Sequence, residues 1–361
     1  MERLDQHAGI PRARLALLFA LFFCICLGLG YPSLNRVDWR TAGGLGDVPW
    51  YVGIVQAHPV PVPDDQRQYR ILVPYLARPV YWVAQGHIGT WDPAMLGLLV
   101  VDSLFVAGTV VLLALVVMES VGKYSAAVGS ALIYLLNFAV PNLRLAGFID
   151  AGEGFFLMAT TWCLLRQRYW VLPLLGFLGA MAKETFVPFL MVFSLCWWVC
   201  SMRTLRYPAR AAAWVVASWL AALSAVMVAQ RIVLGVYQSP LHFGMELHQN
   251  RAYFSYLVWA VKDRNLWYIF FWLLPLSLFR LSHLPLTWRI STAATAVTAF
   301  ALDAYYAGGT GTLGRALFTV TGPLLSASVA ILLLTGVDSD RARAPIEPDT
   351  AAAGNPKELM G

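Results

Sequence analysis

Hydrophobic residues are gathered along this chain into ten long runs, and short polar connections separate most of these runs from one another. A helix needs about 20 apolar residues to cross a lipid bilayer, where its backbone must satisfy its own hydrogen bonds. We therefore predict an all-α, polytopic transmembrane protein with about ten spans. The runs cover residues 13–31, 95–118, 124–141, 152–166, 169–182, 185–202, 210–234, 265–281, 289–307 and 314–336.

Two of the runs, 152–166 and 169–182, are short, and the pattern leaves open whether they are two spans or one re-entrant pair. The first run lacks a clear small-x-small cleavage site and precedes many further spans, so we predict a retained signal anchor. We expect residues 1–336 to form one transmembrane domain. The segment 337–361 is rich in Pro, Ala, Asp and Glu, and we predict a disordered cytoplasmic tail there.

The longest polar interruption is the loop 31–93, between the first two runs. A loop of that length without a core of its own is usually functional or disordered. Trp39, Trp50 and Trp82 argue against disorder, because disordered segments contain few aromatic residues. We expect short interfacial helices in this loop, which hold a carboxylate over a cavity between the spans.

The composition supports a membrane protein. Hydrophobic residues make up 59% of the chain and charged residues 13%, and the mean hydropathy is +0.62. The net charge of +6 does not indicate nucleic acid as a partner, because the basic residues form short clusters between apolar runs instead of one exposed face. All five cysteines lie in apolar runs, which gives no sign of a disulfide or of a metal-thiolate site.

The basic residues of the short connections predict the orientation in the bilayer. If the ten spans alternate, these residues fall on one side, which the positive-inside rule assigns to the cytoplasm. Both termini are then cytoplasmic and the loop 31–93 is on the outer side. The loop contains arginines of its own, but long translocated loops largely escape the rule. The residues that set the orientation are Arg12, Arg14, Lys123, Arg166, Arg168, Arg203, Arg206, Arg210, Arg280, Arg289, Arg341 and Arg343.

A second group of ionisable residues maps to the outer loops or to the outer ends of spans, where such groups are costly unless they are paired or hydrated. They are therefore candidates for function. Asp47 precedes Val48 and Pro49, and it either caps a short interfacial helix or acts as a general base toward an acceptor hydroxyl. Both roles can coexist. The other candidates are Asp150, Glu153, Lys183, Glu184 and Arg315.

Each of these other candidates also has a purely structural interpretation. Lys183 and Glu184 are adjacent opposite charges, which can form an interfacial anchor. If they face inward, Lys183 can instead bind a phosphate, and Glu184 can orient Lys183 or a neighbouring arginine. Arg315 follows a glycine-rich turn at the start of the last run, an arrangement suited to an anion. Asp150 and Glu153 begin a span, and helix capping explains one acid but not two.

Three further groups are weaker candidates. Asp102, inside the second run, is expected to form hydrogen bonds with neighbouring helices. The adjacent pair Asp64 and Asp65 favours a solvated turn, although paired acids can also hold a divalent cation. His242 and His248, with Glu246, lack the spacing of the usual helical zinc pair, so no metal site is predicted there.

With these residues in view, the chain resembles the C-type (GT-C) superfamily of polytopic membrane glycosyltransferases, in its uncharacterised bacterial branch. The resemblance rests on a long outer loop with Gly46-Asp47 and Tyr51, on the segment Tyr69-Arg70-Ile71-Leu72-Val73-Pro74-Tyr75-Leu76, on Ala182-Lys183-Glu184-Thr185, and on a last span that starts with an arginine. The loop contains no Asp-x-Asp or Glu-x-Asp motif. A requirement for a divalent cation therefore stays open, and so does the acceptor.

The resemblance implies a reaction and roles for single residues. The donor would be a polyprenyl-phosphate sugar, and a glycan, a lipid or a protein would be the acceptor on the outer face of a bacterial inner membrane. Asp47 would be the catalytic acid residue. Lys183 and Arg315 would bind the donor phosphate, with Tyr51, Arg70, Asp150, Glu153 and Glu184 in support. Transfer would proceed with inversion, without a covalent enzyme intermediate.

Two other classes of protein share parts of this pattern. A secondary transporter or lipid flippase also has buried charges and broken helices, but it is expected to show two related halves and a site near the midplane. No internal repeat is evident, and the charges lie near one face. A non-catalytic scaffold of a cell-envelope complex is the other alternative, and it predicts that charge-neutral variants at Lys183 and Arg315 keep their function.

Overall fold

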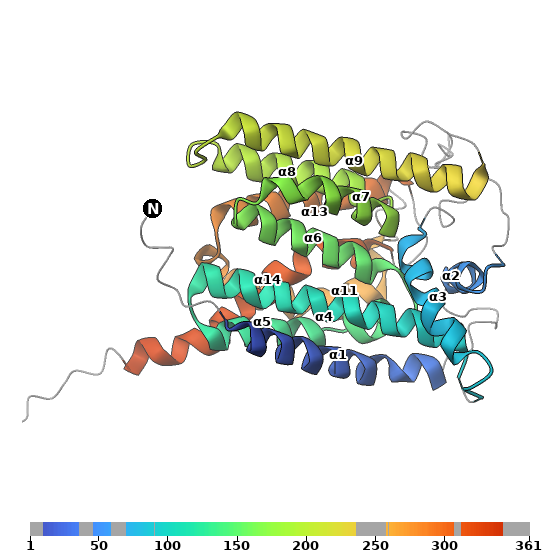
Figure 1. The fold of residues 1–361 in the computed structure, drawn as a ribbon. Coiled ribbons are helices and arrows are strands. Elements are labelled where there is room, and N and C mark those ends of the chain that lie inside the picture. The colour runs from blue at the N-terminus through green and yellow to red at the C-terminus, as the bar shows by residue number, and fades with distance from the viewer. Residues whose placement is uncertain are drawn as a thin grey trace, which may run out of the picture.

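The computed structural model of the chain describes residues 10–35, 46–58, 70–89, 91–235, 258, 260–306 and 312–341, and within these ranges it contains helices and turns but no strand. Most of the helices lie side by side in one elongated bundle (Figure 1). The elements are α1 (Arg12–Asn35), α2 (Val48–Val55), α3 (Leu72–Ala84), α4 (Pro93–Val121), α5 (Tyr124–Leu136), a π-helical turn (Val140–Arg144), α6 (Asp150–Leu165), a 3₁₀ turn (Tyr169–Val171), α7 (Leu172–Ala182), α8 (Phe186–Ser201), α9 (Pro208–Leu234), α11 (Arg264–Phe270), α12 (Leu273–Leu278), a second 3₁₀ turn (Leu281–His283), α13 (Leu286–Tyr306) and α14 (Thr312–Arg341).

The boundaries of the long helix α4 follow from its terminal residues. Asp92 precedes it, and its carboxylate accepts hydrogen bonds from the backbone N–H groups of Ala94 and Met95, which have no acceptor within the helix. Pro93 occupies the first helical position, where a missing N–H costs nothing. Gly122 ends the helix with a φ of 74°, a left-handed conformation that glycine adopts without strain.

Among the described residues, four helices are long and apolar enough to cross a membrane. They are Arg12–Pro32 of α1, Pro93–Val121 of α4, Pro208–Val233 of α9 and Leu313–Leu334 of α14. The all-α prediction is confirmed, but the prediction of about ten spans is wrong. The described part of the chain has four candidate spans, because several of the other apolar runs form helices that are shorter than a bilayer requires.

The shorter helices have local causes. α5 stops after 13 residues, and the side chain of Asn137 then accepts a hydrogen bond from the N–H of Ala139 and donates one to the carbonyl of Ile269. The run 265–281 is divided into α11 and α12. The runs 152–166 and 169–182 form a helical hairpin of α6 and α7, in which Gln167 has a φ of 54° and the N–H of Arg168 donates to the carbonyl of Cys163.

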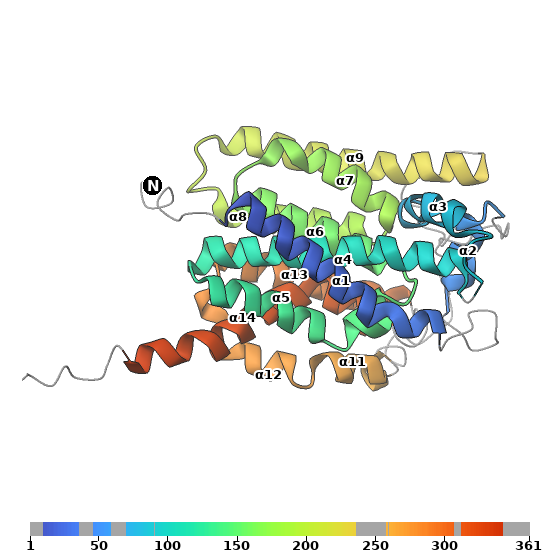
Figure 2. The ribbon, with the colours of Figure 1, turned by 60° about the horizontal axis from the view of Figure 1, so that its bottom comes forward.

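The long helices divide into inner and outer ones. In the most apolar 18-residue stretch of each helix, 61% of α4 and 72% of α14 is buried inside the protein, against 17% of α1 and 33% of α9. Figure 2 shows α1 crossing the outside of the bundle over α4. Large apolar side chains on the outside, such as Leu17, Leu220 and Val297, are more than half exposed. Apolar exposure on this scale is typical of a surface that meets lipid or a partner.

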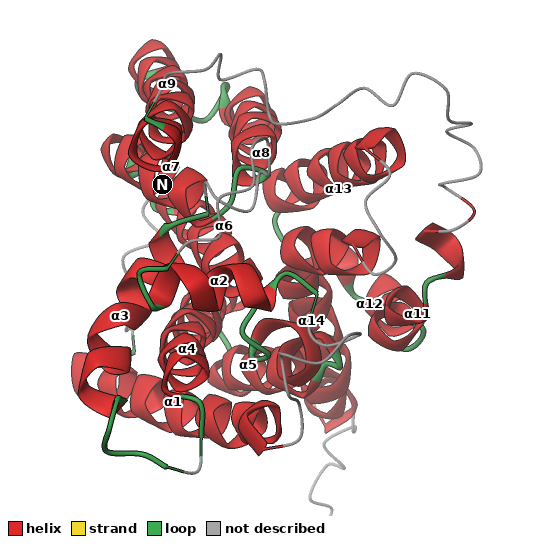
Figure 3. Cartoon of the chain, turned by 90° about the vertical axis from the view of Figure 1, so that its right-hand side faces the viewer, coloured by secondary structure: helices red, strands yellow, loops and turns green. Residues whose placement is uncertain are grey.

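Figure 3 views the bundle from one end, where α2 and α3 lie across the ends of the long helices. Arg78 of α3 donates two hydrogen bonds to the carbonyl of Ile54 and so joins the two helices. Val73 and Ala77 face the bundle, whereas Trp82 is 63% exposed. The prediction of short helices in the loop 31–93 is confirmed for these two segments. Trp39, Asp64 and Asp65 lie outside the described residues.

Of the predicted tail, 337–361, the structure describes only residues 337–341. α14 continues to Arg341 and so reaches five residues into the predicted tail, whose disorder stays a prediction. The hydrophobic pattern ends earlier than the helix, because a helix can extend beyond its apolar stretch on backbone hydrogen bonds alone. Residues 342–361, together with His242, Glu246 and His248, lie outside the described part of the chain.

Candidate functional site

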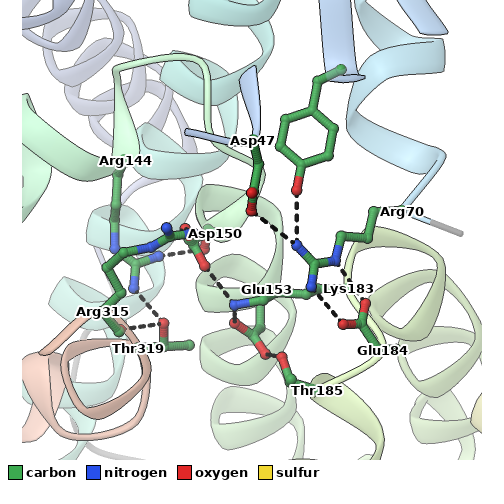
Figure 4. Close-up of polar contacts among 11 residues, drawn as sticks. Asp47, Arg70, Arg144, Asp150, Glu153, Lys183, Glu184, Thr185, Arg315 and Thr319 are labelled. Carbon is green, nitrogen blue, oxygen red and sulfur yellow. Dashed lines mark hydrogen bonds and ion pairs between the residues drawn. The ribbon is translucent and has the colours of Figure 1, made fainter. Parts of the chain in front are cut away.

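Eight charged side chains from separate parts of the sequence gather at the end of the bundle where α2 and α3 lie (Figure 4). We call this group the ionic network. It combines residues that precede α2 and α3, the π-helical turn, the first turn of α6, the connection between α7 and α8, and the first turns of α14. Its members are Asp47, Arg70, Arg144, Asp150, Glu153, Lys183, Glu184 and Arg315.

One half of the network is centred on Arg70. Its Nε and Nη2 atoms donate to the two carboxylate oxygens of Glu184 at 2.8 and 2.6 Å, a bidentate arrangement that is strong and directional. Its Nη1 atom donates to the hydroxyl of Tyr51 at 2.9 Å and lies 3.5 Å from an oxygen of Asp47. The guanidinium therefore fixes α2 and the segment before α3 to the connection between α7 and α8.

The other half is centred on the carboxylate of Asp150. One of its oxygens accepts a hydrogen bond from Lys183 at 2.6 Å, and the other accepts two from Arg315, through Nε at 2.9 Å and Nη2 at 2.5 Å. Lys183 also donates to Glu153 at 3.2 Å. Arg315 stacks on the ring of Phe148 at 4.4 Å, which fixes the plane of the guanidinium.

Arg144 completes this half without a direct carboxylate partner among the described residues. It donates to the backbone carbonyl of Asp150 and, at 2.7 Å, to the hydroxyl of Thr319. Gly154 makes room for it, since a Cβ at that position would lie 2.5 Å from Nη1 of Arg144. The π-helical turn brings the arginine to this place, and π-helical turns are frequent at functional sites.

The network is largely shielded from water, and its charges balance. The side chains of Asp150, Glu153 and Glu184 are 0–2% exposed, whereas that of Asp47 is 29% exposed. Four carboxylates face four cations, which is the condition under which a buried ionic group is tolerated. Asp47 is consequently the member of the network whose carboxylate a bound molecule can reach.

The shifts in pKa follow from this pairing. Burial lowers the pKa of Arg70, but the Glu184 carboxylate and Tyr51 outweigh that effect and raise it above the ordinary value. Burial raises the pKa of Glu184, and the Arg70 guanidinium, with its hydrogen bonds, brings it below the ordinary value. For Lys183, Asp150 and Glu153 together outweigh burial and raise the pKa. These groups are therefore charged at neutral pH.

Several structural interpretations of these residues are wrong. Asp47 directly precedes α2, yet its side chain makes no capping hydrogen bond, and Gly46, with a φ of 57°, turns the chain just before it. Asp150 and Glu153 do not cap α6 either, because their carboxylates are engaged by Lys183. Lys183 and Glu184 are no interfacial anchor, since as whole residues they are only 8% and 3% exposed and their side chains point into the network.

The structure brings all eight predicted site residues together, including Tyr51, but it leaves their chemical roles as predictions. Sequence reasoning missed Arg144, Thr185, whose hydroxyl bonds Glu153, and Thr319. The one signal for Arg144 was an arginine shortly after Pro141 at the end of an apolar run. The expectation for Asp102 is wrong, since it is fully buried and neither of its carboxyl oxygens has a hydrogen-bond partner among the residues that the structure describes.

The described residues contain no group of three or more His, Cys, Asp or Glu side chains placed to hold a metal ion. Three carboxylates of the network, Asp150, Glu153 and Glu184, do not fit a divalent cation as they stand. Asp150 and Glu153 bind Lys183, and Glu184 binds both edges of a guanidinium. A cation would need these same oxygen atoms.

Two cavities lie elsewhere. A groove of about 880 Å³ runs along α3 and is lined by apolar side chains such as Pro79, Val83 and Leu96. A smaller cavity of about 280 Å³ is formed by the connection between α6 and α7 and by the start of α9. Neither cavity is lined by a member of the ionic network.

Comparisons with known proteins add no assignment. A scan against models of protein families finds no match, and searches of the curated proteins and of the solved structures find none either. Any functional interpretation therefore rests on the sequence pattern and on the geometry of the ionic network.

Proposed function

We propose that this protein is a multi-pass membrane glycosyltransferase that moves a sugar from a polyprenyl-phosphate donor to an acceptor hydroxyl, with inversion at the anomeric carbon. The bacterial inner membrane is the proposed location, with both termini in the cytoplasm and the ionic network on the outer face. The chain supplies the general requirements: four helices that can cross a membrane and two short helices over the end where the charges gather.

The single observation that carries this proposal is the difference between Asp47 and the other three carboxylates. Asp150, Glu153 and Glu184 are buried and engaged by cations, whereas Asp47 is 29% exposed and lies 3.5 Å from Arg70. A carboxylate that lies beside a cation and is still accessible can take a proton from a bound hydroxyl. Arg70 would orient it.

The reaction balances as one substitution. Asp47 accepts the proton of the acceptor hydroxyl, whose oxygen then forms a bond to the anomeric carbon of the sugar. The bond from that carbon to the phosphate oxygen breaks, and polyprenyl phosphate leaves with the electron pair. Since phosphate is a good leaving group, the protein mainly has to stabilise the charge that gathers on it.

Of the two proposed phosphate ligands, Arg315 is better placed than Lys183 to bind the phosphate directly. The side chain of Arg315 is 15% exposed, and its bonds to Asp150 use Nε and Nη2, so Nη1 takes no part in them. Lys183 is 10% exposed and is shared between Asp150 and Glu153. We therefore assign direct phosphate binding first to Arg315. Lys183 would contribute by holding Asp150 in place and by adding positive charge behind it.

The experiment that tests the proposal is mass spectrometry of envelope glycans and lipid-linked intermediates in a strain that lacks the gene. The expected result is accumulation of one sugar-charged polyprenyl phosphate and loss of one sugar from an envelope product. Complementation with the unaltered gene should reverse both changes, whereas complementation with Arg315→Met should reverse neither. A transporter or flippase would instead change where the lipid accumulates, and a scaffold would tolerate Arg315→Met, so either result would contradict the proposal.

A further inference from the structure

The smaller cavity lies at the other end of the bundle from the ionic network. α6 begins in the network at Asp150 and ends at Leu165, which places its last residue about 22 Å away along the helix axis. The cavity follows directly, between the turn after α6 and the connection from α8 to α9, which lies at the left of Figure 1. We call it the basic-aromatic cavity. Its principal lining residues are Tyr169, Trp170, Arg206, Tyr207, Arg210 and Trp214.

The cavity carries positive charge without a matching acid. No described Asp or Glu lines it, and neither Arg206 nor Arg210 forms an ion pair with a described carboxylate. By contrast, Arg166 at the same end of the bundle is paired with Glu119 at 2.7 Å. Arg210 lies in the first turn of α9, where the helix dipole adds positive potential. The cavity therefore favours an anion.

A second observation is independent of this charge. Tyr169 is 6% exposed, and its buried hydroxyl has no hydrogen-bond partner in the described part of the protein. Buried hydroxyl groups normally have a partner, because an unsatisfied one costs free energy. The left-handed turn at Gln167 fixes this part of the wall, since the N–H of Arg168 bonds the carbonyl of Cys163. Tyr169 lines the same cavity as the arginines, and its hydroxyl has a hydrogen bond left to donate.

The aromatic residues indicate at what depth the cavity lies. Trp170 is 67% exposed and Tyr207 is 59% exposed, although both are large. Tryptophan and tyrosine are enriched at the level of the lipid headgroups, where one part of the ring is apolar and the other is wet. The indole N–H of Trp198 bonds the carbonyl of Pro208, which holds the start of α9 against α8. The anion is therefore expected at headgroup depth.

We propose that the basic-aromatic cavity binds a phosphate ester, supplied by the headgroup of an anionic phospholipid. Arg206 and Arg210 are the charged ligands and Tyr169 is the hydroxyl donor. The site is separate from the ionic network and does not depend on the reaction proposed there. Its role is to hold one lipid at the connection between α8 and α9, and so to fix that end of the bundle in the membrane.

The test uses the full-length protein in detergent and measures binding of short-chain phosphatidylglycerol by native mass spectrometry and by the shift in melting temperature. We expect Arg206→Gln/Arg210→Gln to weaken binding by at least about tenfold, the scale of a lost charged hydrogen bond. Tyr169→Phe should weaken it several-fold. The matched control is the double variant Arg168→Gln/Arg203→Gln, because both arginines are exposed, neither lines the cavity, and the same number of charges is removed.

Two further probes separate the sources of the phosphate. Short-chain phosphatidylcholine, which has no net charge, should bind more weakly than phosphatidylglycerol. Glycerol 3-phosphate should bind weakly, and tight binding of it that Arg206→Gln/Arg210→Gln abolishes would assign the site to a soluble phosphate ester and overturn the lipid assignment. Equal losses in Arg206→Gln/Arg210→Gln and in Arg168→Gln/Arg203→Gln would show nonspecific charge attraction only and would overturn the site altogether.

Discussion

Replacing Glu184 with alanine is expected to destabilise the protein by about 3 kcal/mol. The side chains of Arg70 and Glu184 are 11% and 2% exposed, and the variant removes the acceptor of two hydrogen bonds from the guanidinium. Removal of one partner of a buried ion pair costs about 3–5 kcal/mol, because the remaining charge is left uncompensated. The lower end applies here, since Arg70 keeps Tyr51 and Asp47 as neighbours.

This loss of free energy corresponds to a measurable shift in melting temperature. Unfolding entropies of about 2.1 cal/mol/K per residue, taken over 361 residues, amount to about 0.76 kcal/mol/K. A loss of about 3 kcal/mol then lowers the melting temperature by about 4 °C. Thermal unfolding of the purified protein in detergent, followed by tryptophan fluorescence, measures this shift.

Two matched variants decide whether the loss arises from an uncompensated buried charge. Glu119→Ala removes a carboxylate whose side chain is 25% exposed and whose partner Arg166 is 40% exposed, so it should cost less than about 1 kcal/mol. The double variant Arg70→Met/Glu184→Leu removes both charges and should recover at least half of the loss from Glu184→Ala. The reasoning is refuted if Glu184→Ala costs no more than Glu119→Ala, or if the double variant is less stable than Glu184→Ala alone.

Three further predictions concern the same end of the bundle. Folding lowers the pKa of Glu184 from 4.5. Its contribution to stability is therefore present above about pH 4.5 and is lost as the pH falls through the lower pKa of the folded protein. The melting temperature should fall less steeply with acid in Glu184→Gln than in the unaltered protein, and equal slopes would contradict this. Asp102→Leu should leave the melting temperature unchanged or raise it, since no hydrogen bond is lost, and a fall of several degrees would be the contrary result. Gly154→Ala should cost about 1–3 kcal/mol, because the added Cβ displaces Arg144. Gly28→Ala in α1 is the control and should be neutral, since nothing lies within 4 Å of an added Cβ there. Similar melting temperatures for the two variants would show that Arg144 does not approach Gly154 closely.

The sequence was informative about the residues of the site and less so about the number of spans. Costly charges at the ends of apolar runs mark a site, since burial demands that they be paired. That argument selected Asp150, Lys183 and Arg315, which share one set of contacts although 165 positions separate Asp150 from Arg315. It could not say which cation pairs with which acid, because that depends on how the helices pack.

The span count failed for a related reason. Hydropathy measures how apolar a run is, but not whether the helix in it continues. The run 124–141 contains Asn137, whose side chain bonds the backbone of Ala139 and so competes with the helix. Arg144 was missed in the same region, because a single arginine beside an apolar run resembles an interfacial anchor until the π-helical turn is seen.

The central claim is that the carboxylate of Asp47 does chemistry at the end of the bundle, and sugar transfer by the purified protein in proteoliposomes tests it most directly. The donor would be the polyprenyl-phosphate sugar that accumulates in the deletion strain. The control is Glu119→Gln, which removes a partly exposed carboxylate that is likewise close to an arginine. We predict that Asp47→Asn lowers turnover by about 10²- to 10⁴-fold, the contribution of a general base, with an unchanged melting temperature, while Glu119→Gln keeps full activity. Full turnover in a correctly folded Asp47→Asn protein would contradict the account.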